Sequence, residues 1–234
     1  MLRTYLENKQ NQLMNQQVDF YTPGGIQVYF KDALENPDID VESVVASVEG
    51  KIPNHLLSEI EMIAVGWFKE FEERNLNAFY KDAILHVSNI QDDEADMADD
   101  IIHEIAHAAE EVYGYDIYGD NEIRKEFLQK RERLHDELWA LGYKVPKSFF
   151  LETEYNEEFD NFLLKTVGYD KLSVICNGLF INAYAPTSLR EYFATAFTDY
   201  YMNMSDHTPL KRVSPAVYKK LSTLNRKDFV DRHP

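Results

Sequence analysis

His103-Glu104-Ile105-Ala106-His107, an HExxH motif, is the most informative stretch of this chain. Two histidines four residues apart on a helix project from the same side, so both imidazoles can reach one metal ion. Glu104 lies between them, beside the metal but not bound to it, where it could take a proton from water on the metal. This spacing is typical of a zinc peptidase, with His103 and His107 as metal ligands and Glu104 as catalytic base.

The residues around the motif favour a buried helix. No Pro or Gly occurs from Ala98 to Tyr113, and Asp96, Asp99 and Asp100 suit the positive end of a helix dipole. An apolar side and small alanines would let neighbouring elements pack closely: these residues are Ile101, Ile102, Ile105, Ala106, Ala108 and Ala109. The alternative is a pair of core histidines that are satisfied by hydrogen bonds and bind no metal.

A catalytic zinc ion needs a third protein ligand and an open position for water. One class of HExxH peptidase uses a later histidine preceded by a glycine, but the corresponding positions here are Tyr113 and Glu110. A second class uses an aspartate after a Gly-Thr turn, and the chain contains no Gly-Thr pair. A third class takes a glutamate from a later helix. Glu191 fits that role within Tyr184-Ala-Pro-Thr-Ser-Leu-Arg-Glu191-Tyr-Phe-Ala-Thr-Ala-Phe197.

This segment resembles the zinc-binding C-terminal half of the anthrax lethal factor family, which includes the clostridial Pro-Pro endopeptidases. In that family a glutamate ligand opens a helix of the form Glu-Phe-Phe-Ala-Glu-Ala-Phe, and this chain has Glu-Tyr-Phe-Ala-Thr-Ala-Phe from Glu191. A family tyrosine seven residues earlier directs its hydroxyl at the reacting carbonyl, and Tyr184 has that spacing. The stretch from His103 to Gly142 is also similar, whereas Thr195 stands where the family often has an acid. The resemblance implies a gluzincin-type zinc metallopeptidase with one zinc ion per chain.

The expected reaction is zinc-dependent hydrolysis of a peptide bond by an endopeptidase. Zinc lowers the pKa of bound water to roughly 7, and Glu104 takes the proton and passes it to the leaving amine. Zinc and the Tyr184 hydroxyl would stabilise the oxyanion. Two other interpretations stay open. Ser188-Leu-Arg-Glu191 is also a capping box, and Tyr184 is one of 15 tyrosines, most of which must be packing residues.

Segments of alternating character predict an α+β fold that is helix-rich, with a small mixed sheet beside the HExxH helix. The resemblance implies that this is a zincin-like catalytic domain. The general order of elements over residues 20–100 also matches the family. The strand at 84–89 would be either an edge that pairs with an extended substrate or an ordinary interior strand. The expected strands are 26–30, 60–67 and 83–87, and the expected helices outside the motif are 41–52, 69–74 and 121–141.

We expect residues 1–17 to form a polar N-terminal tail and residues 18–234 to form a single zincin-like metallopeptidase domain. Within that domain, residues 18–96 would be a sheet-containing lobe and residues 97–234 a helical lobe. Residues 144–183 connect the two halves of the expected site, so they are the candidate substrate pocket or lid.

Composition limits the cellular setting. With 234 residues and 44% hydrophobic content, the chain can bury a substantial core. Cys176 is the single cysteine, which excludes an intrachain disulfide and favours a small buried side chain. We see no apolar run at the N-terminus and no stretch long enough to span a membrane. A cytoplasmic protein, or one within a virion or other assembly, is the simpler expectation.

The net charge of −17 argues against a nucleic-acid partner, because phosphates require a basic surface. It weakly favours basic peptides by long-range steering, although acidity can equally serve solubility. We therefore expect a peptide or protein substrate, and neither nucleic acid nor membrane as a partner.

A second function stays open from the sequence. The chain could be a zinc-stabilised structural or interaction protein of a larger assembly such as a phage particle, docked through its N-terminal tail. Its peptidase site would then be vestigial or activated by a partner. Glu104 favours the enzyme, because a purely structural zinc site has no need for a general base.

Zinc-binding histidines usually donate their second N–H to an oxygen, and Glu110 and Asp116 are both candidates for that role. The sequence does not choose between them. The remaining histidines have no ligand partner at helical spacing and are assigned no function: His55, His86, His135, His207 and His233.

Overall fold

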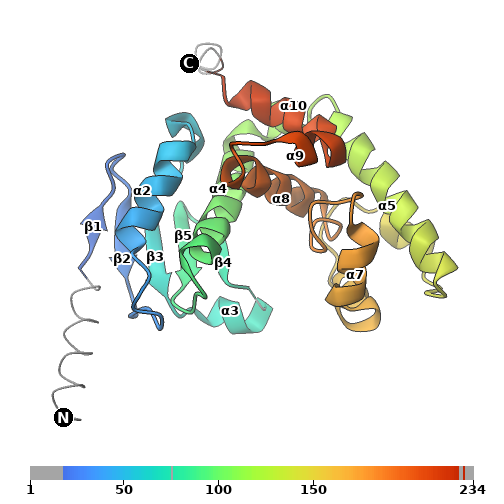
Figure 1. Ribbon diagram of the computed structural model, residues 1–234, viewed down its shortest axis with the longest axis horizontal. Helices are drawn as coiled ribbons and strands as arrows, with labels where there is room; N and C mark the ends of the chain where they lie inside the picture. The colour runs from blue at the N-terminus through green and yellow to red at the C-terminus, as the bar shows by residue number, and fades with distance from the viewer. Residues whose placement is uncertain (1–17, 75, 227–228, 230–234) are drawn as a thin grey trace, which may run out of the picture. The chain divides into compact units, whose positions relative to one another are not determined.

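The computed structural model describes residues 18–74, 76–226 and 229, so the tail expected over residues 1–17 lies outside the described residues. The chain divides into two compact units, the first ending at Val112 and the second beginning at Tyr113. The structure is 57% helical and contains a small mixed sheet of five strands (Figure 1). The predicted α+β fold is therefore confirmed.

The first unit is built around the sheet, whose strand order is β1-β2-β3-β5-β4. The inner pairs β2–β3 and β3–β5 are parallel, and the outer pairs β1–β2 and β4–β5 are antiparallel. The expected strands correspond to β2, β3 and β5, whereas β1 and β4 were not predicted. The bounds are β1 Phe20–Tyr21, β2 Gln27–Phe30, β3 Met62–Gly66, β4 Ala78–Lys81 and β5 Ile84–Ser88.

The strand expected at residues 84–89 is not an edge strand. β5 lies inside the sheet between β3 and β4, so its suggested role as a substrate-pairing edge is wrong and its reading as an interior strand is confirmed. Asp82 and Ala83 have φ values of 52° and 63°, and positive φ at both central residues is the geometry of a tight two-residue hairpin turn. The turn folds β4 against β5 and gives β4 the outer position.

Three short helical segments join these strands. α2 (Val41–Lys51) follows the N-cap Asp40, whose carboxylate accepts a hydrogen bond from the Ser43 N–H at 3.1 Å. α2 buries Val41, Val44, Val45 and Val48. The 3-10 turn η1 (Asn54–Leu57) comes after Pro53, and α3 (Lys69–Arg74) follows β3, as the sequence predicted.

The HExxH motif lies on α4 (Glu94–Tyr118), which is longer at both ends than the sequence suggested. Asp93 caps its start, since its carboxylate accepts hydrogen bonds from the N–H groups of Ala95 at 2.8 Å and Asp96 at 2.9 Å. At the other end the helix continues through Gly114 into the second unit. The buried side of α4 in the first unit consists of Met97, Ala98, Ile101, Ile102, Ile105, Ala106, Ala108 and Ala109.

The second unit is helical. Its central element is α8, in which nine residues between Tyr192 and Tyr201 are buried. Cys176 ends α7 and is 1% exposed, and burial raises the pKa of its thiol to about 12, which confirms a packing residue. The elements are α5 Glu122–Ala140, η2 Lys147–Phe150, α6 Glu157–Asn161, η3 Phe162–Val167, α7 Tyr169–Cys176, α8 Leu189–Met202, α9 Thr208–Val213 and α10 Pro215–Leu224.

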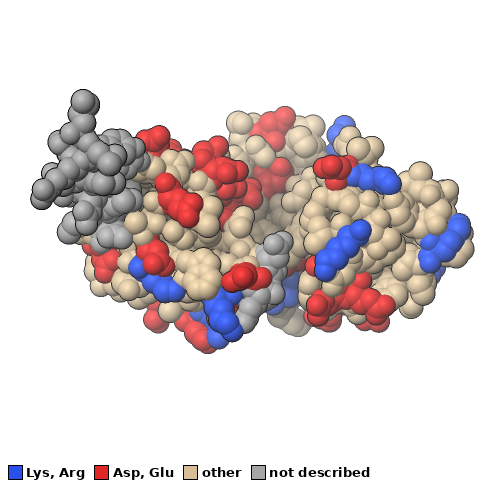
Figure 2. Space-filling view, turned by 90° about the horizontal axis from the view of Figure 1, so that it is seen from below, with Lys and Arg blue, Asp and Glu red and all other residues tan. Residues whose placement is uncertain are grey.

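The described surface carries both signs of charge. On the face drawn in Figure 2, Lys and Arg side chains are interspersed with Asp and Glu rather than gathered into one basic patch. Among the described helices, none is long and apolar enough to cross a membrane.

Candidate metal centre

His103 and His107 occupy successive turns on one side of α4. Their ring centroids lie 5.1 Å apart, and both residues are half-buried. This is the arrangement that the four-residue spacing predicts, because residues i and i+4 are neighbours on a helix surface. The first unit thus presents two imidazoles side by side, as a metal site requires.

Glu110 is the carboxylate that orients His107. Its Oε2 lies 2.9 Å from His107 Nδ1, and the two side chains are 5% and 13% exposed. With Nδ1–H donated to Glu110, Nε2 of His107 carries the lone pair that a metal ligand needs. Of the two carboxylates that the sequence left open, Glu110 is the one that contacts His107 Nδ1.

For a zinc ion bound by the histidine pair, replacing Glu110 with Gln should lower the affinity by about tenfold, the low end of the effect of removing a charged partner of a ligand histidine. The neutral amide oxygen can still accept the Nδ1–H but stabilises the imidazole less. Competition with a chromophoric chelator measures the affinity. Glu111→Gln is the matched control, since Glu111 is the next, exposed residue of α4. Equal affinities for the two variants would contradict this role of Glu110.

Glu104 is held by the edge strand. It is 8% exposed, and its Oε2 accepts a hydrogen bond from the main-chain N–H of Tyr80 on β4 at 2.8 Å. The Tyr80 hydroxyl donates to Glu111, about two turns further along α4, at 3.2 Å. Tyr80 could not be found from the sequence, because β4 itself was not predicted. A carboxylate fixed in this way keeps one oxygen bonded and the other in a defined direction.

Asp100 lies one turn before the motif and is unusual for its protonation. Its carboxylate accepts a hydrogen bond from Gln91 Nε2 at 3.0 Å. The pKa of Asp100 is raised to about 6, mainly by burial; the bond from Gln91 lowers it, and the nearby carboxylates of Asp96, Asp99 and Glu104 add to the rise. A negative charge at this position therefore costs stability.

The contribution of Asp100 to the stability of the metal-free protein should therefore fall as the pH rises from about 4 to about 6. The folded state holds the Asp100 proton more tightly than the unfolded chain, whose aspartate pKa is near 3.9. The stability that protonated Asp100 contributes is therefore fully present below about pH 4 and is lost as the pH rises through about 6. Asp100→Asn should remove this contribution and be more stable than wild type at pH 7 by up to about 3 kcal/mol.

Urea unfolding between pH 4 and 7 in the presence of EDTA measures this difference. Asp38→Asn, at an exposed position outside α4, is the control and should follow the wild-type curve. If Asp100→Asn is no more stable than wild type at pH 7, the ionised Asp100 carboxylate does not destabilise the folded protein.

Glu191 lies in the first turn of α8. Ser188 is the N-cap, and its Oγ accepts the N–H of Glu191 at 3.1 Å, so the capping interaction considered from the sequence is present in this direction. The preceding turn is fixed from a distant segment, because the N–H of Leu189 donates to the main-chain oxygen of Thr153 at 2.8 Å. Both bonds use main-chain groups of α8, and the Glu191 side chain remains a candidate ligand.

Tyr184 is held in a tight turn just before α8. Asn182 Oδ1 accepts the N–H groups of Tyr184 at 3.0 Å and Ala185 at 2.9 Å. The main-chain oxygen of Tyr184 accepts from both the N–H and the hydroxyl of Thr187. An asparagine that bonds residues two and three positions ahead is a recognisable turn signal, so Asn182 could have been found from the sequence.

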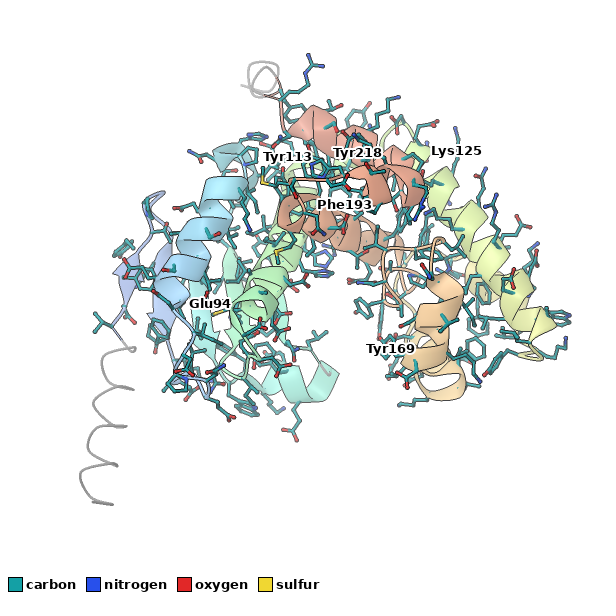
Figure 3. The ribbon with its side chains drawn as sticks, in the orientation of Figure 1. Glu94, Tyr113, Lys125, Tyr169, Phe193 and Tyr218 are labelled. Carbon is teal, nitrogen blue, oxygen red and sulfur yellow. The ribbon has the colours of Figure 1, made fainter. Side chains whose placement is uncertain are left out.

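Acidic and aromatic groups of the second unit surround Tyr184. Burial, then the charges of Glu191 and Asp160, raise the pKa of Tyr184 above the usual tyrosine range, so its hydroxyl stays a proton donor at neutral pH. Tyr155 donates to Asp160 at 3.1 Å, and burial also raises the pKa of Tyr169, which begins α7 (Figure 3). Tyr184 and Glu191 therefore share one electrostatic environment, as their seven-residue spacing suggested.

Three of the histidines without an assigned function pack against aromatic rings. His86 is stacked on Phe79 with ring centroids 4.3 Å apart, and His207 is stacked on Tyr200 at 4.2 Å. His135 lies against Phe150 at 5.1 Å. His233 lies outside the described residues.

No family model, curated protein or solved structure matches this chain.

Proposed function

We propose that His103, His107 and Glu191 together bind one zinc ion, since these described residues form a group that could hold a metal. Two imidazoles and one carboxylate are a frequent ligand set of catalytic zinc, which leaves the fourth position for water. The hydrogen bond between His107 and Glu110 fits this assignment, because ligand histidines usually donate their second N–H to a carboxylate or carbonyl.

The course of α4 also supports the proposal. The helix carries both histidines in the first unit and continues into the second, where the Tyr118 ring contacts Phe193 with centroids 6.0 Å apart. Phe193 belongs to the first part of α8, two residues after Glu191, and is labelled in Figure 3. The end of α4 therefore packs, within the second unit, against the helix that carries Glu191.

The catalytic assignment rests on Glu104. When bound, zinc would act as a Lewis acid that lowers the pKa of water and polarises a carbonyl. Glu104 would take the proton from the attacking water and deliver it to the leaving amine. The Tyr184 hydroxyl would donate a hydrogen bond to the oxygen of the reacting carbonyl. We therefore propose a zinc-dependent endopeptidase that resembles the anthrax lethal factor family.

The observation that carries the proposal is a glutamate held within a histidine pair by a main-chain N–H, as Glu104 is by Tyr80. A structural zinc site, which is usually closed by four protein ligands, has no use for such a base. The peptide or protein substrate belongs to the same proposal.

Two measurements on the purified full chain test this proposal. The first determines zinc per chain for wild type, His107→Ala and Glu191→Ala, with Glu122→Ala, an exposed glutamate on α5, as control. We expect one zinc per chain in wild type and control and a loss in the two site variants. The second exposes the zinc-loaded protein to a proteome-derived peptide library and reads new termini by mass spectrometry. If the protein binds zinc but cleaves no peptide, the proposed enzymatic activity is wrong. If wild type binds no zinc, the proposed metal site is wrong.

A further inference from the structure

Helix α5 carries charged side chains on its buried side, which is rare in protein cores unless the charges are paired or hydrogen-bonded. Lys130 is 8% exposed and Arg131 is 1% exposed, and Glu126 on the same side is half-buried. The sequence offered no role for these residues. Their hydrogen bonds lead to the beginning of α8 and to the segment that holds it.

Glu126 bridges two other elements. Its Oε1 accepts the hydroxyl of Tyr192 at 2.7 Å, and its Oε2 accepts the N–H of Ala216 at the start of α10 at 2.8 Å. Tyr192 is the residue directly after Glu191. Its side chain is fully buried, and burial raises its pKa well above the usual range, so the hydroxyl donates at any physiological pH.

Aromatic and cationic groups fix the plane of the Tyr192 ring. The ring centroid lies 5.4 Å from that of Phe127 and 5.8 Å from that of Phe180. Lys130 Nζ lies 5.1 Å from the same centroid and donates to the main-chain oxygen of Leu179 at 2.7 Å. Rotation of the first turn of α8 would have to displace this ring from its contacts.

Arg131 supports the same turn from another side. Its guanidinium donates to the main-chain oxygens of Phe149 and Glu152, the latter at 2.7 Å, and lies over the Phe159 ring. The next residue, Thr153, accepts the N–H of Leu189 at the first position of α8. α5 therefore holds the start of α8 in two ways. Glu126 accepts the Tyr192 hydroxyl, and Arg131 binds the segment whose Thr153 oxygen accepts the Leu189 N–H.

We infer that the Glu126–Tyr192 hydrogen bond is a positioning contact for Glu191, setting the rotation of the first turn of α8 so that the carboxylate points at the metal. The inference rests on the proposed zinc site. Glu126 and Tyr192 touch neither metal nor substrate, and they act through the helix backbone. Metal ligands must be held within about half an ångström of the productive geometry, so a small rotation of this turn is enough to weaken binding.

The test compares Tyr192→Phe with Tyr201→Phe. Both tyrosines are fully buried on α8, and each donates one hydrogen bond, Tyr201 to Asn225 Oδ1 at 3.3 Å. Each variant therefore loses one hydroxyl from the core of the same helix, but only Tyr192 adjoins Glu191. The measurements are the thermal midpoint, zinc affinity by chelator competition and the visible spectrum of the cobalt-substituted protein, which reports ligand geometry.

We expect Tyr192→Phe to bind zinc about tenfold more weakly than wild type and to change the cobalt spectrum. Tyr201→Phe should match wild type in zinc affinity and in the cobalt spectrum, even if its thermal midpoint falls as much as that of Tyr192→Phe. Glu126→Asp withdraws the same acceptor from the other side and should lower the zinc affinity as Tyr192→Phe does, although it also disturbs the bond from the Ala216 N–H. If wild type binds one zinc and the two Phe variants bind it equally, the inference is wrong while the zinc site stands. If wild type binds no zinc, the proposed function itself is wrong.

Discussion

Glu104→Gln protein should bind zinc as wild type does and cleave peptides about 10³-fold more slowly, within the usual contribution of a general acid–base group. Gln retains an oxygen that can accept the Tyr80 N–H, which Glu104 accepts at 2.8 Å, so the side chain keeps its place. The amide has no lone pair basic enough to take a proton from water. The variant therefore separates chemistry from metal binding, and kcat with bound zinc per chain measures both.

Glu111→Gln is the matched control for this experiment. Glu111 lies on the same helix and also bonds to Tyr80, through the hydroxyl at 3.2 Å, but it is exposed. Its replacement should leave kcat within about twofold, as is usual for a surface substitution away from the chemistry. Full activity in zinc-loaded Glu104→Gln would rule out Glu104 as the base. A variant that has lost its zinc would instead assign Glu104 to the metal.

The HExxH helix could be predicted because its signals are local. The four-residue spacing, the apolar isoleucines and the early aspartates all concern one segment, and α4 forms as expected around His103 and His107. Its N-terminus was placed too late because the capping residue is Asp93, which accepts the N–H groups of Ala95 and Asp96. Several aspartates in a row made each of them a plausible cap.

The sheet edge could not be predicted for a different reason. Strand order depends on pairing between distant segments, and the turn between β4 and β5 uses Asp82 and Ala83 in place of a glycine-containing pair. Alanine rarely adopts positive φ, so the hairpin lacked its usual signal. The consequence reaches the candidate site, since the N–H that bonds Glu104 belongs to Tyr80 on that unpredicted strand.

The start of α8 has local features that the sequence predicts and long-range contacts that it does not. Ser188 as N-cap follows from the sequence, and the resemblance indicated Tyr184 and Glu191 at their spacing. The partners that fix this region come from far along the chain: the main-chain oxygen of Thr153 and the side chain of Glu126. Contacts of this kind carry no local pattern, so packing alone reveals them.

Tyr184→Phe protein should bind zinc with unchanged affinity and turn over about 10²–10³-fold more slowly, the usual cost of removing one oxyanion donor. The turn that holds Tyr184 uses main-chain bonds to Asn182 and Thr187, which the substitution leaves intact. Because the pKa of the hydroxyl is raised above the usual tyrosine range, the donor stays protonated across the neutral and mildly alkaline range. The rate should therefore show no fall that reflects tyrosine ionisation below about pH 10.

Tyr169→Phe is the control that makes this result specific. Tyr169 feels the charges of the same two carboxylates, Asp160 and Glu191, but is 37% exposed, so its replacement removes a nearby hydroxyl that is not buried. We expect its kcat to stay within about threefold of wild type, because a hydroxyl that does not meet the developing charge contributes little to the rate. If Tyr169→Phe is the slow variant and Tyr184→Phe is not, the donor is Tyr169. The seven-residue spacing to Glu191 would then reflect the turn that leads into α8 and not the chemistry.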